Sequence, residues 1–411
     1  MPEPISKAFR VVVVGGGIAG LAAGIALRGE GREVTVLEAS GMNKEIGAAI
    51  SLQPNAVKIL QQWGVEDEFR KRGGAVDSGF QIFRTDGQLQ MKIPFFTSQY
   101  GADRLCFHRV DLHDALKAVA LSESLPGSPV NIRVSSRVKS CDCEKGIVRL
   151  DSGEEIQADL IIGADGIHSK IREAVLGEKK IAVPTGLSAY RLIIPAEKLF
   201  DIPHVSSMMT DKDPWTTMVV GHSCRAVMGP CRNQSLLSIV GLVPDEKMHE
   251  EASKTSWTES GSMEDLLASF EDFPPWLKDT FKTCPDLGLW QLRDFDPLPT
   301  WVKGRTILIG DAAHAMLPLQ GQGASQSFED AEALGTLFKG FSTTSLEETN
   351  AVLQEVFNAR YERASLIQGY SRQAARPGTA VGSTKITMNP KEFMDYNCNY
   401  SGVEAWMANQ N

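Results

Sequence analysis

The sequence predicts an α/β fold, in which a parallel sheet is interrupted by an inserted β-rich domain and followed by a C-terminal helix. A βαβ unit opens the chain: residues 9–14 are apolar and β-branched, 18–28 form a helix of small residues, and 33–37 are a second strand. Between about 184 and 290, short β-like runs alternate with Pro, Gly and Asp, which is typical of a separate β domain. Residues 306–309 are again a buried strand, so we expect the chain to return to its first sheet there.

These elements divide the chain into four segments. In order, they are the first part of the main domain (1–183, with an embedded β segment at 80–100), the β-rich insert (184–295), the return to the main domain (296–340), and a C-terminal helix and tail (341–411). The helix is amphipathic over 346–372, and the residues beyond Arg376 are polar and irregular.

The composition is that of a soluble globular protein. The chain has 411 residues, 42% of them hydrophobic, a net charge of −9 and no basic block, which argues against nucleic-acid binding. Residues 11–27 carry no charge, but their β-branched run, three glycines and alanines indicate a strand, a turn and a helix rather than a membrane span. Seven cysteines without a CxxC pair indicate neither a disulfide framework nor a metal site. Because the N-terminus is too polar for a signal peptide, we expect a cytoplasmic protein with no membrane partner.

A glycine-rich turn in the βαβ unit predicts a dinucleotide site. Gly15, Gly17 and Gly20 lie between the first strand and its helix, and Glu38 ends the second strand. The first glycine allows the tight turn, the second lets a pyrophosphate approach the backbone, and the third lets helix and strand pack closely. A carboxylate at Glu38 can accept ribose hydroxyls and disfavours a 2′-phosphate.

Two further strand ends carry polar turns. Residues 160–172 end a strand in Gly163-Ala-Asp165-Gly and enter a helix, so Asp165 is either a ligand or a helix cap. Residues 305–324 combine a strand, Asp311, Pro318 and a glycine-rich entry to a helix at Gly321–Ala324. The carboxylate can accept hydroxyl hydrogen bonds, and the free N–H groups of the helix favour negative charge.

Taken together, the three motifs resemble the group A flavoprotein monooxygenases, which have the p-hydroxybenzoate hydroxylase fold. The likeness covers about the first 340 residues and is nearest to the salicylate-hydroxylase-like branch, which residues 47–56 and Arg109 at the start of its helix also match. It implies a Rossmann-type FAD-binding domain with an inserted substrate domain. It also implies a single-component enzyme that uses NAD(P)H and O2 to add one oxygen atom to an aromatic or alkaloid-like substrate through a flavin hydroperoxide.

The resemblance assigns roles to individual residues. Gly15, Gly17, Gly20 and Glu38 would hold the ADP half of FAD, and Arg109 would reach its pyrophosphate and ribityl region. Asp165 would lie where FAD and NAD(P)H are both recognised, and Asp311 would accept from the ribityl hydroxyls. Gly321, Gly323 and Ala324 would face the flavin N1 edge, Ala49 would join the cofactor site, and Pro318 would lie beside the oxygen-reacting carbon. His314 is expected to serve packing rather than catalysis.

No second GxGxxG motif occurs, so the resemblance implies that the nicotinamide cofactor binds transiently. Epoxidation or oxidative rearrangement of an indole or alkene stays open as an alternative to hydroxylation. So do a flavin oxidase or reductase of the same fold and a flavin-binding redox sensor. We expect a monomer or a homodimer.

The substrate side rests on fewer residues. Arg191 either anchors a substrate anion or orients the flavin hydroperoxide, or it pairs with a carboxylate at the domain boundary. Many phenol hydroxylases of the family carry a Tyr where this chain has Gly229, which leaves Tyr190 or His222 as a substitute base, or a non-phenolic substrate. Gln53 is a further candidate for the substrate pocket.

Overall fold

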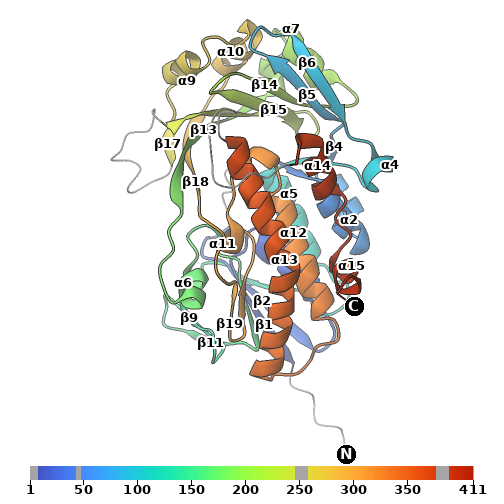
Figure 1. Cartoon of the computed structure of the whole chain (residues 1–411), viewed down its shortest axis with the longest axis vertical. Helices are drawn as coiled ribbons and strands as arrows, with labels where there is room; N and C mark the ends of the chain where they lie inside the picture. Colours follow the sequence, from blue (N-terminus) through green and yellow to red (C-terminus); the bar gives the residue numbers. More distant parts are fainter. Residues whose placement is uncertain (1–7, 43–47, 246–257, 376–387, 411) are drawn as a thin grey trace, which may run out of the picture.

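The computed structural model describes residues 8–42, 48–245, 258–375 and 388–410. Its lower half is built on a six-stranded sheet (Figure 1). The strand order is β19 (Val302–Lys303), β20 (Thr306–Leu308), β12 (Leu160–Gly163), β1 (Phe9–Val14), β2 (Arg32–Leu37) and β8 (Asn131–Arg133). All neighbours are parallel except β19 and β20, so the expected parallel sheet and the return of the chain to it are confirmed.

Helices pack against this sheet and against one another. They are α1 (Ile18–Ala26), α5 (Arg109–Leu121), α6 (Lys170–Leu176), α12 (Gly323–Leu337) and α13 (Leu346–Ala375), with α2 (Pro54–Gln62) and α3 (Glu66–Lys71) beside them. α12 and α13 lie side by side along the length of the molecule (Figure 1). Small residues let α1 and α12 lie close together: a Cβ built on Gly335 of α12 would be 2.8 Å from the carbonyl oxygen of Ala26 in α1.

Two small sheets flank the main one. One contains β3 (Ala49–Leu52), β7 (Leu105–His108) and β4 (Ala75–Val76), and the other contains β11 (Glu155–Gln157), β10 (Ile147–Leu150) and β9 (Val138–Asp142).

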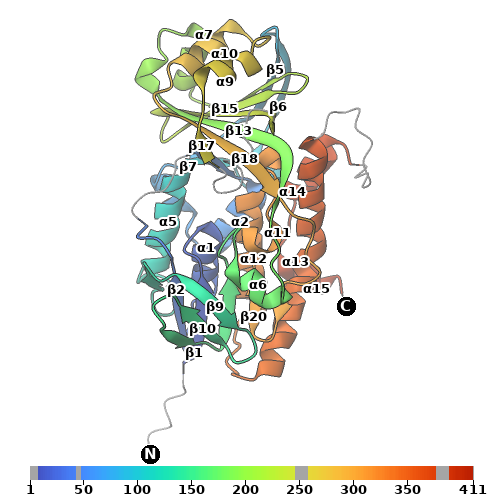
Figure 2. The same ribbon diagram turned by 90° about the vertical axis from the view of Figure 1, so that its left-hand side faces the viewer.

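The upper half is an eight-stranded sheet covered by helices (Figure 2), three of which lie within the described ranges. Its order is β17 (Thr258–Ser260), β18 (Leu287–Asp294), β13 (Val183–Pro195), β16 (Leu236–Pro244), β15 (Arg225–Cys231), β14 (Thr216–Val220), β5 (Gly79–Arg84) and β6 (Leu89–Pro94). The helices are α7 (Pro203–Thr210), α9 (Met263–Ser269) and α10 (Pro275–Lys282). The hairpin β5–β6 was expected in the first segment, yet β5 pairs with β14 of the insert, an assignment that only long-range pairing reveals.

The two faces of this sheet differ in burial because successive side chains along a strand point to opposite sides. On the outer face, Tyr190, Leu192, Ile239 and Met228 are buried in a core shared with the three helices. On the inner face, which points toward the six-stranded half, Ala189, Ser238 and Leu242 are buried, whereas other residues of the same strands, such as Arg191 and Val240, are only half-buried. The site is built on this inner face.

The C-terminal region corrects one expectation. Residues 388–410 contain α14 (Pro390–Cys398) and α15 (Val403–Ala408), so the expectation of an irregular tail was wrong there; residues 376–387 lie outside the described part of the chain. Asn389 and Glu392 form a capping box that starts α14. The Tyr400 hydroxyl donates to Glu332 on α12 at 2.8 Å, which holds this region against the main domain.

Within the described ranges, no helix has the length and apolar character needed to cross a bilayer. The same ranges contain no group of three or more His, Cys, Asp or Glu side chains arranged to hold a metal ion.

Candidate functional site

The three glycines of the turn after β1 have different surroundings. Two lie against neighbouring backbone, and the third faces open space. A Cβ on Gly15, whose φ is +108°, would lie 2.3 Å from the Ala164 carbonyl oxygen, and one on Gly20 would lie 1.9 Å from the Gly15 oxygen. A Cβ on Gly17 would meet nothing within 4 Å. Gly17 precedes α1, so the open space lies at a helix N-terminus, where backbone N–H groups suit a phosphate. This geometry fits the pyrophosphate of FAD.

Glu38 lies beside that turn as an ionised acceptor. Its carboxylate accepts from the backbone N–H of Gly16 at 2.8 Å and of Ser40 at 2.7 Å. Burial alone would raise the pKa of Glu38, but these N–H groups outweigh it and the net pKa is lowered. Sequence reasoning missed His113 of α5, whose Nε2 lies 2.7 Å from the Gly16 carbonyl oxygen and ties the turn to that helix.

Asp165 caps a helix. Its carboxylate accepts from the backbone N–H groups of Lys170 at 2.6 Å and Ile171 at 3.1 Å, at the start of α6. Burial raises the pKa of Asp165, against these hydrogen bonds. The buried Arg172 donates to the carbonyl of Ala312 at 3.1 Å, so this turn also holds α11 (Asp311–His314) in place. Asp165 is therefore a helix cap, and its role as a cofactor ligand stays a prediction.

Asp311 is an acceptor with unused capacity. Its side chain is open to solvent, yet protein surrounds it closely enough that burial is the largest influence on its pKa and raises it. His314, Arg109 and Arg172 act in the opposite direction. No hydrogen bond between described residues reaches this carboxylate. A deep, accessible carboxylate at the end of a strand suits a ligand that brings its own hydroxyl donors.

The turn at residues 318–323, which we call the flavin-proximal turn after its expected role, is held by two amide side chains. Residues Pro318–Gln320 form a short 3-10 turn, Gly321 has φ +59°, and α12 begins at Gly323. Gln53 donates from Nε2 to the Gln320 carbonyl at 2.7 Å and accepts at Oε1 from Gln322 at 2.7 Å. Because both ends of the buried Gln53 amide are used in this way, its expected place in the substrate pocket is corrected to a positioning role.

Below this turn lies a buried ionic cluster, which we define as Glu329, Asp330, Arg360, Arg363 and His314. Arg360 donates to Glu329 at 2.5 Å and to Asp330 at 3.0 Å, and Arg363 donates to Glu329 at 2.7 Å. His314 Nε2 lies 2.7 Å from Asp330, so the structural reading of His314 agrees with its contacts. The cluster joins α12 to α13 directly behind the turn. Sequence reasoning missed it, although charged residues on the apolar face of a helix were the signal that could have revealed it.

The strand register of the eight-stranded sheet defines what faces the flavin-proximal turn. One row of its inner face, Ala189 and Leu242, packs against Leu317. Four residues from Leu242 along β16, Ser238 accepts from the Ala49 backbone N–H at 3.0 Å. Between these two contacts lies a half-buried row, which we call the inner row. It consists of Arg191, Val240, Val227 and Met218.

Arg191 has no acidic partner among the residues that the structure describes. Its guanidinium lies 5.0 Å from the Trp290 ring centroid, and its pKa is lowered first by burial and then by Arg109. No carboxylate of the described residues forms an ion pair with it. The alternative of a boundary ion pair is therefore not seen in the described chain.

The other two substrate-side candidates lie elsewhere. Tyr190 points to the outer face and is buried in the core of the insert, because neighbouring residues of a strand face opposite ways. His222 is exposed in the turn between β14 and β15. Both expectations are thus corrected. Gly229 is on the inner face, and a Cβ there would come no closer than 3.7 Å to Thr216.

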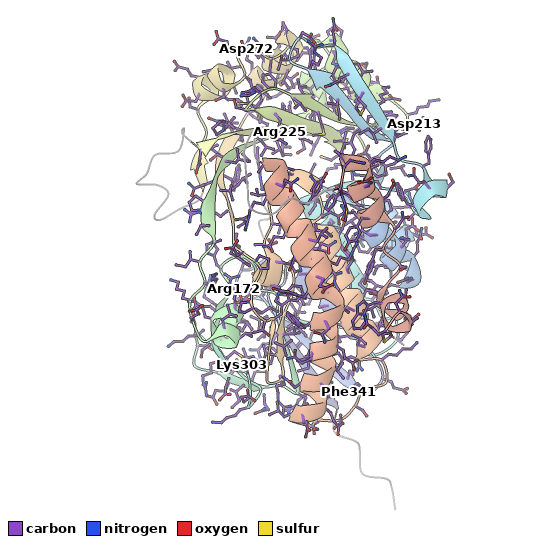
Figure 3. The ribbon with its side chains drawn as sticks, in the orientation of Figure 1. Arg172, Asp213, Arg225, Asp272, Lys303 and Phe341 are labelled. Atoms are coloured by element: carbon purple, nitrogen blue, oxygen red, sulfur yellow. The ribbon has the colours of Figure 1, made fainter. Side chains whose placement is uncertain are left out.

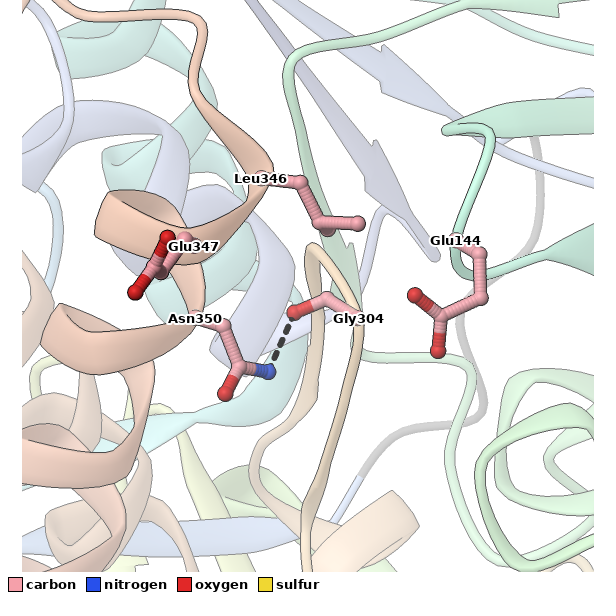
Figure 4. A pocket seen from close by; sticks show the side chains of 5 residues that line it. All are labelled: Glu144, Gly304, Leu346, Glu347 and Asn350. Atoms are coloured by element: carbon pink, nitrogen blue, oxygen red, sulfur yellow. Dashed lines mark hydrogen bonds between the residues drawn. The ribbon is translucent and has the colours of Figure 1, made fainter.

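A hollow in the surface lies far from these residues and has none of the features of a substrate site. It lies between the turns at Glu144 and Gly304 and the start of α13, where Asn350 donates to the Gly304 carbonyl at 2.7 Å (Figure 4). It is open and holds no buried polar group that lacks a partner.

Comparison with known proteins agrees with this geometry. The family model described as FAD binding domain matches residues 8–344. Hispidin-3-hydroxylase of Neonothopanus nambi is 32% identical over 379 residues, which cover 89% of this chain and 88% of that protein. The 6-hydroxynicotinate 3-monooxygenase of Bordetella bronchiseptica is 31% identical over 372 residues, covering 88% and 90%.

Solved structures share the fold. A salicylate hydroxylase in complex with its substrate has a TM-score of 0.75 and 27% identity, and the match covers 91% of each chain. CtdE in complex with FAD and a substrate has a TM-score of 0.77 over 95% of this chain and 97% of that chain, at 24% identity.

Proposed function

Since this chain belongs to the FAD-binding domain family and is an FAD-dependent monooxygenase, we propose that it uses NAD(P)H and O2 to oxygenate an aromatic substrate held by Arg191. FAD, when bound, supplies the redox chemistry that activates oxygen. The chain supplies binding, orientation and exclusion of water. The observation that carries this proposal is a half-buried arginine on the inner face that no described carboxylate neutralises.

The cofactor roles are part of the same proposal. The open position at Gly17, the ionised Glu38 and the unused acceptor Asp311 support a site for the ADP and ribityl parts of FAD. The remaining cofactor contacts are proposed at Gly15, Gly20, Ala49, Arg109, Gly321, Gly323 and Ala324. Asp165, which also caps α6, is proposed as a further cofactor contact.

Arg191 and Pro318 are proposed to flank the reacting atoms. Pro318 is exposed between Leu317 and Leu319, both of which pack against the inner face beside the inner row. A guanidinium there can bind a carboxylate, a carbonyl or a phenolate oxygen and so fix which ring carbon is presented.

The test replaces Arg191 by Gln and by Lys and identifies products over a panel of aromatic acids, phenols and indoles. We expect Arg191→Gln to lower product formation by about a hundredfold, the scale of losing a charge-assisted contact in catalysis, with FAD still bound. Arg149→Gln, which removes a surface partner of Glu155, is the matched control. Unchanged product formation in Arg191→Gln would return this residue to a structural role.

Gly229 favours a second candidate reaction. The inner row and Gly229 offer no base, because their side chains are apolar apart from the permanently charged Arg191. Epoxidation or oxidative rearrangement of a non-phenolic indole or alkene needs no deprotonated phenol. Product identification with indoles against phenols decides between the two reactions.

Three further expectations complete the proposal. We propose a cytoplasmic location, a monomeric or homodimeric state, and the domain boundaries near residues 183, 295 and 340. Fractionation, sedimentation and limited proteolysis, respectively, test them.

A further inference from the structure

A second cation lies on the inner face. Arg225 of β15 is two residues before Val227 in the same strand, so both side chains point to the same side of the sheet. Its cross-strand neighbour is Leu242, which packs against Leu317 beside Pro318. Figure 3 labels Arg225 under the sheet, above the end of α13.

Arg225 keeps most of its hydrogen-bonding capacity. One of its five N–H groups donates to the Ala374 carbonyl at 3.1 Å, near the end of α13. Burial is the only influence that lowers its pKa, and no acidic side chain of the described residues acts on it. Its remaining nitrogens are not among the buried polar atoms that lack a partner. The guanidinium is thus half-buried, reachable and not neutralised.

The distance between the two arginines bears on the ligand. Arg191 and Arg225 lie two strands and two residues apart, so their Cα atoms are roughly 12 Å from each other. The apolar side chains of Val240 and Val227 lie between them. A ligand that meets both cations therefore needs an apolar, ring-sized middle and an anionic group beyond the ring.

We propose that Arg225 binds a carboxylate or other anionic group on a side arm of the substrate, while the reacting ring lies under Val227 and Val240. The substrate class is then an elongated aromatic acid rather than a compact phenol. This inference rests on the proposed function, because it assumes that the inner row covers the substrate.

The experiment compares 4-hydroxycinnamate with its methyl ester, which has the same ring and arm without the charge. Binding is measured by perturbation of the flavin absorbance in the FAD-loaded enzyme, and turnover by product identification. We expect the wild type to prefer the acid, and Arg225→Gln to weaken acid binding about tenfold while ester binding is unchanged. Arg225→Lys should recover part of the acid preference, because it keeps the charge but loses the planar fork.

The matched control is Arg84→Gln on β5 of the same sheet, where Arg84 is largely exposed and lies 3.2 Å from Asp86. It removes one positive charge and should leave both affinities unchanged. Equal weakening of acid and ester in Arg225→Gln, with a lower Tm, would make Arg225 only an anchor for α13 and overturn the inference. A wild type that binds the ester as tightly as the acid would overturn it as well. Failure of the proposed function is separate: it would appear as binding without any oxygenated product.

Discussion

The main domain and the inserted sheet use buried charge in opposite ways. In the ionic cluster next to the flavin-proximal turn, Arg360 and Glu329 are fully buried and share one short hydrogen bond. On the inner face, Arg191 and Arg225 are half-buried and have no carboxylate among the described residues. The first arrangement satisfies its charges internally and holds the turn in place. The second leaves charge available to a ligand.

The same contrast separates two aspartates. Asp330 accepts from His314, Arg360 and the Gly310 backbone, whereas Asp311 receives no hydrogen bond from a described residue. Because Asp311 is open to solvent and keeps its acceptor capacity, it points to binding rather than to stability.

The largest expected effect comes from breaking the paired cluster. Arg360→Met should lower the free energy of unfolding by about 3–5 kcal/mol, because Glu329 and Asp330 would lose a buried partner. Urea unfolding measures it, and Arg84→Met, at an exposed pair, should show no measurable loss. A change in Arg360→Met as small as that of the control would refute the proposed role of the cluster.

Replacing Asp311, which has no hydrogen-bond donor among the described residues, should weaken cofactor binding instead. We expect Asp311→Ala to raise the Kd for FAD by about ten- to a hundredfold, since hydroxyl donors of the ligand would lose a charged acceptor. The ratio of FAD to protein after gel filtration measures this, with the exposed Asp114→Ala as control. A variant that keeps a full complement of FAD would contradict the assignment.

Acid should weaken the paired cluster within a defined pH range. The pKa of Asp330 is about 2, because the charges of His314 and Arg360 and its hydrogen bonds outweigh burial. A lowered folded-state pKa gives stability that is present above the unfolded value near 3.8 and is lost as the pH falls toward 2. We expect a loss of ~2 kcal/mol across that range in the wild type. Asp330→Asn should lack this component, so equal pH slopes for the two proteins would exclude it.

Arg191 on the inner face should contribute little to the stability of the protein. Arg191→Met loses the contact with Trp290 but relieves the burial of an unneutralised charge, so its free energy of unfolding should stay within about 1 kcal/mol of the wild type. Thermal and urea unfolding measure this beside Arg360→Met. If the two variants lost equal stability, the contrast between paired and unpaired arginines would be wrong.

The smallest effect on stability and activity is expected for a substitution of Tyr190, the neighbour of Arg191 in β13. The Tyr190 hydroxyl makes no hydrogen bond to a described residue and points away from the inner face, so Tyr190→Phe should leave both stability and product formation unchanged. Product formation that falls as far as in Arg191→Gln would restore Tyr190 as a catalytic candidate.

Motif reasoning succeeded where backbone geometry dictates the residue. Gly15 and Gly20 are required by contacts of 2.3 Å and 1.9 Å that a Cβ would make, and such steric demands leave a trace in the sequence itself. The strand that ends before Asp311 and the helix that begins at Gly323 were predicted for the same reason, because turns and helix entries depend on local residues.

Side-chain partners could not be predicted in this way. Gln53 and Gln320 are far apart in sequence, and so are Arg363 and Glu329, and no local pattern pairs them. The face of Tyr190 depended on a strand register that a shift of one residue would reverse. The helices after residue 388 were not predicted, because the polar composition suggested an irregular tail although the sequence contains a capping box.

The sequence by itself determined the parallel sheet, the glycine turn for a dinucleotide and the strand-end carboxylate, because each depends on a few neighbouring residues. Only the tertiary structure decided which charges are neutralised and which face a ligand. It pairs Arg360 with Glu329, places Tyr190 in the core of the insert, and leaves Arg191 and Arg225 on the inner face. Pairing depends on contacts between distant segments, and the energy of a buried charge depends on those contacts more than on the identity of the residue.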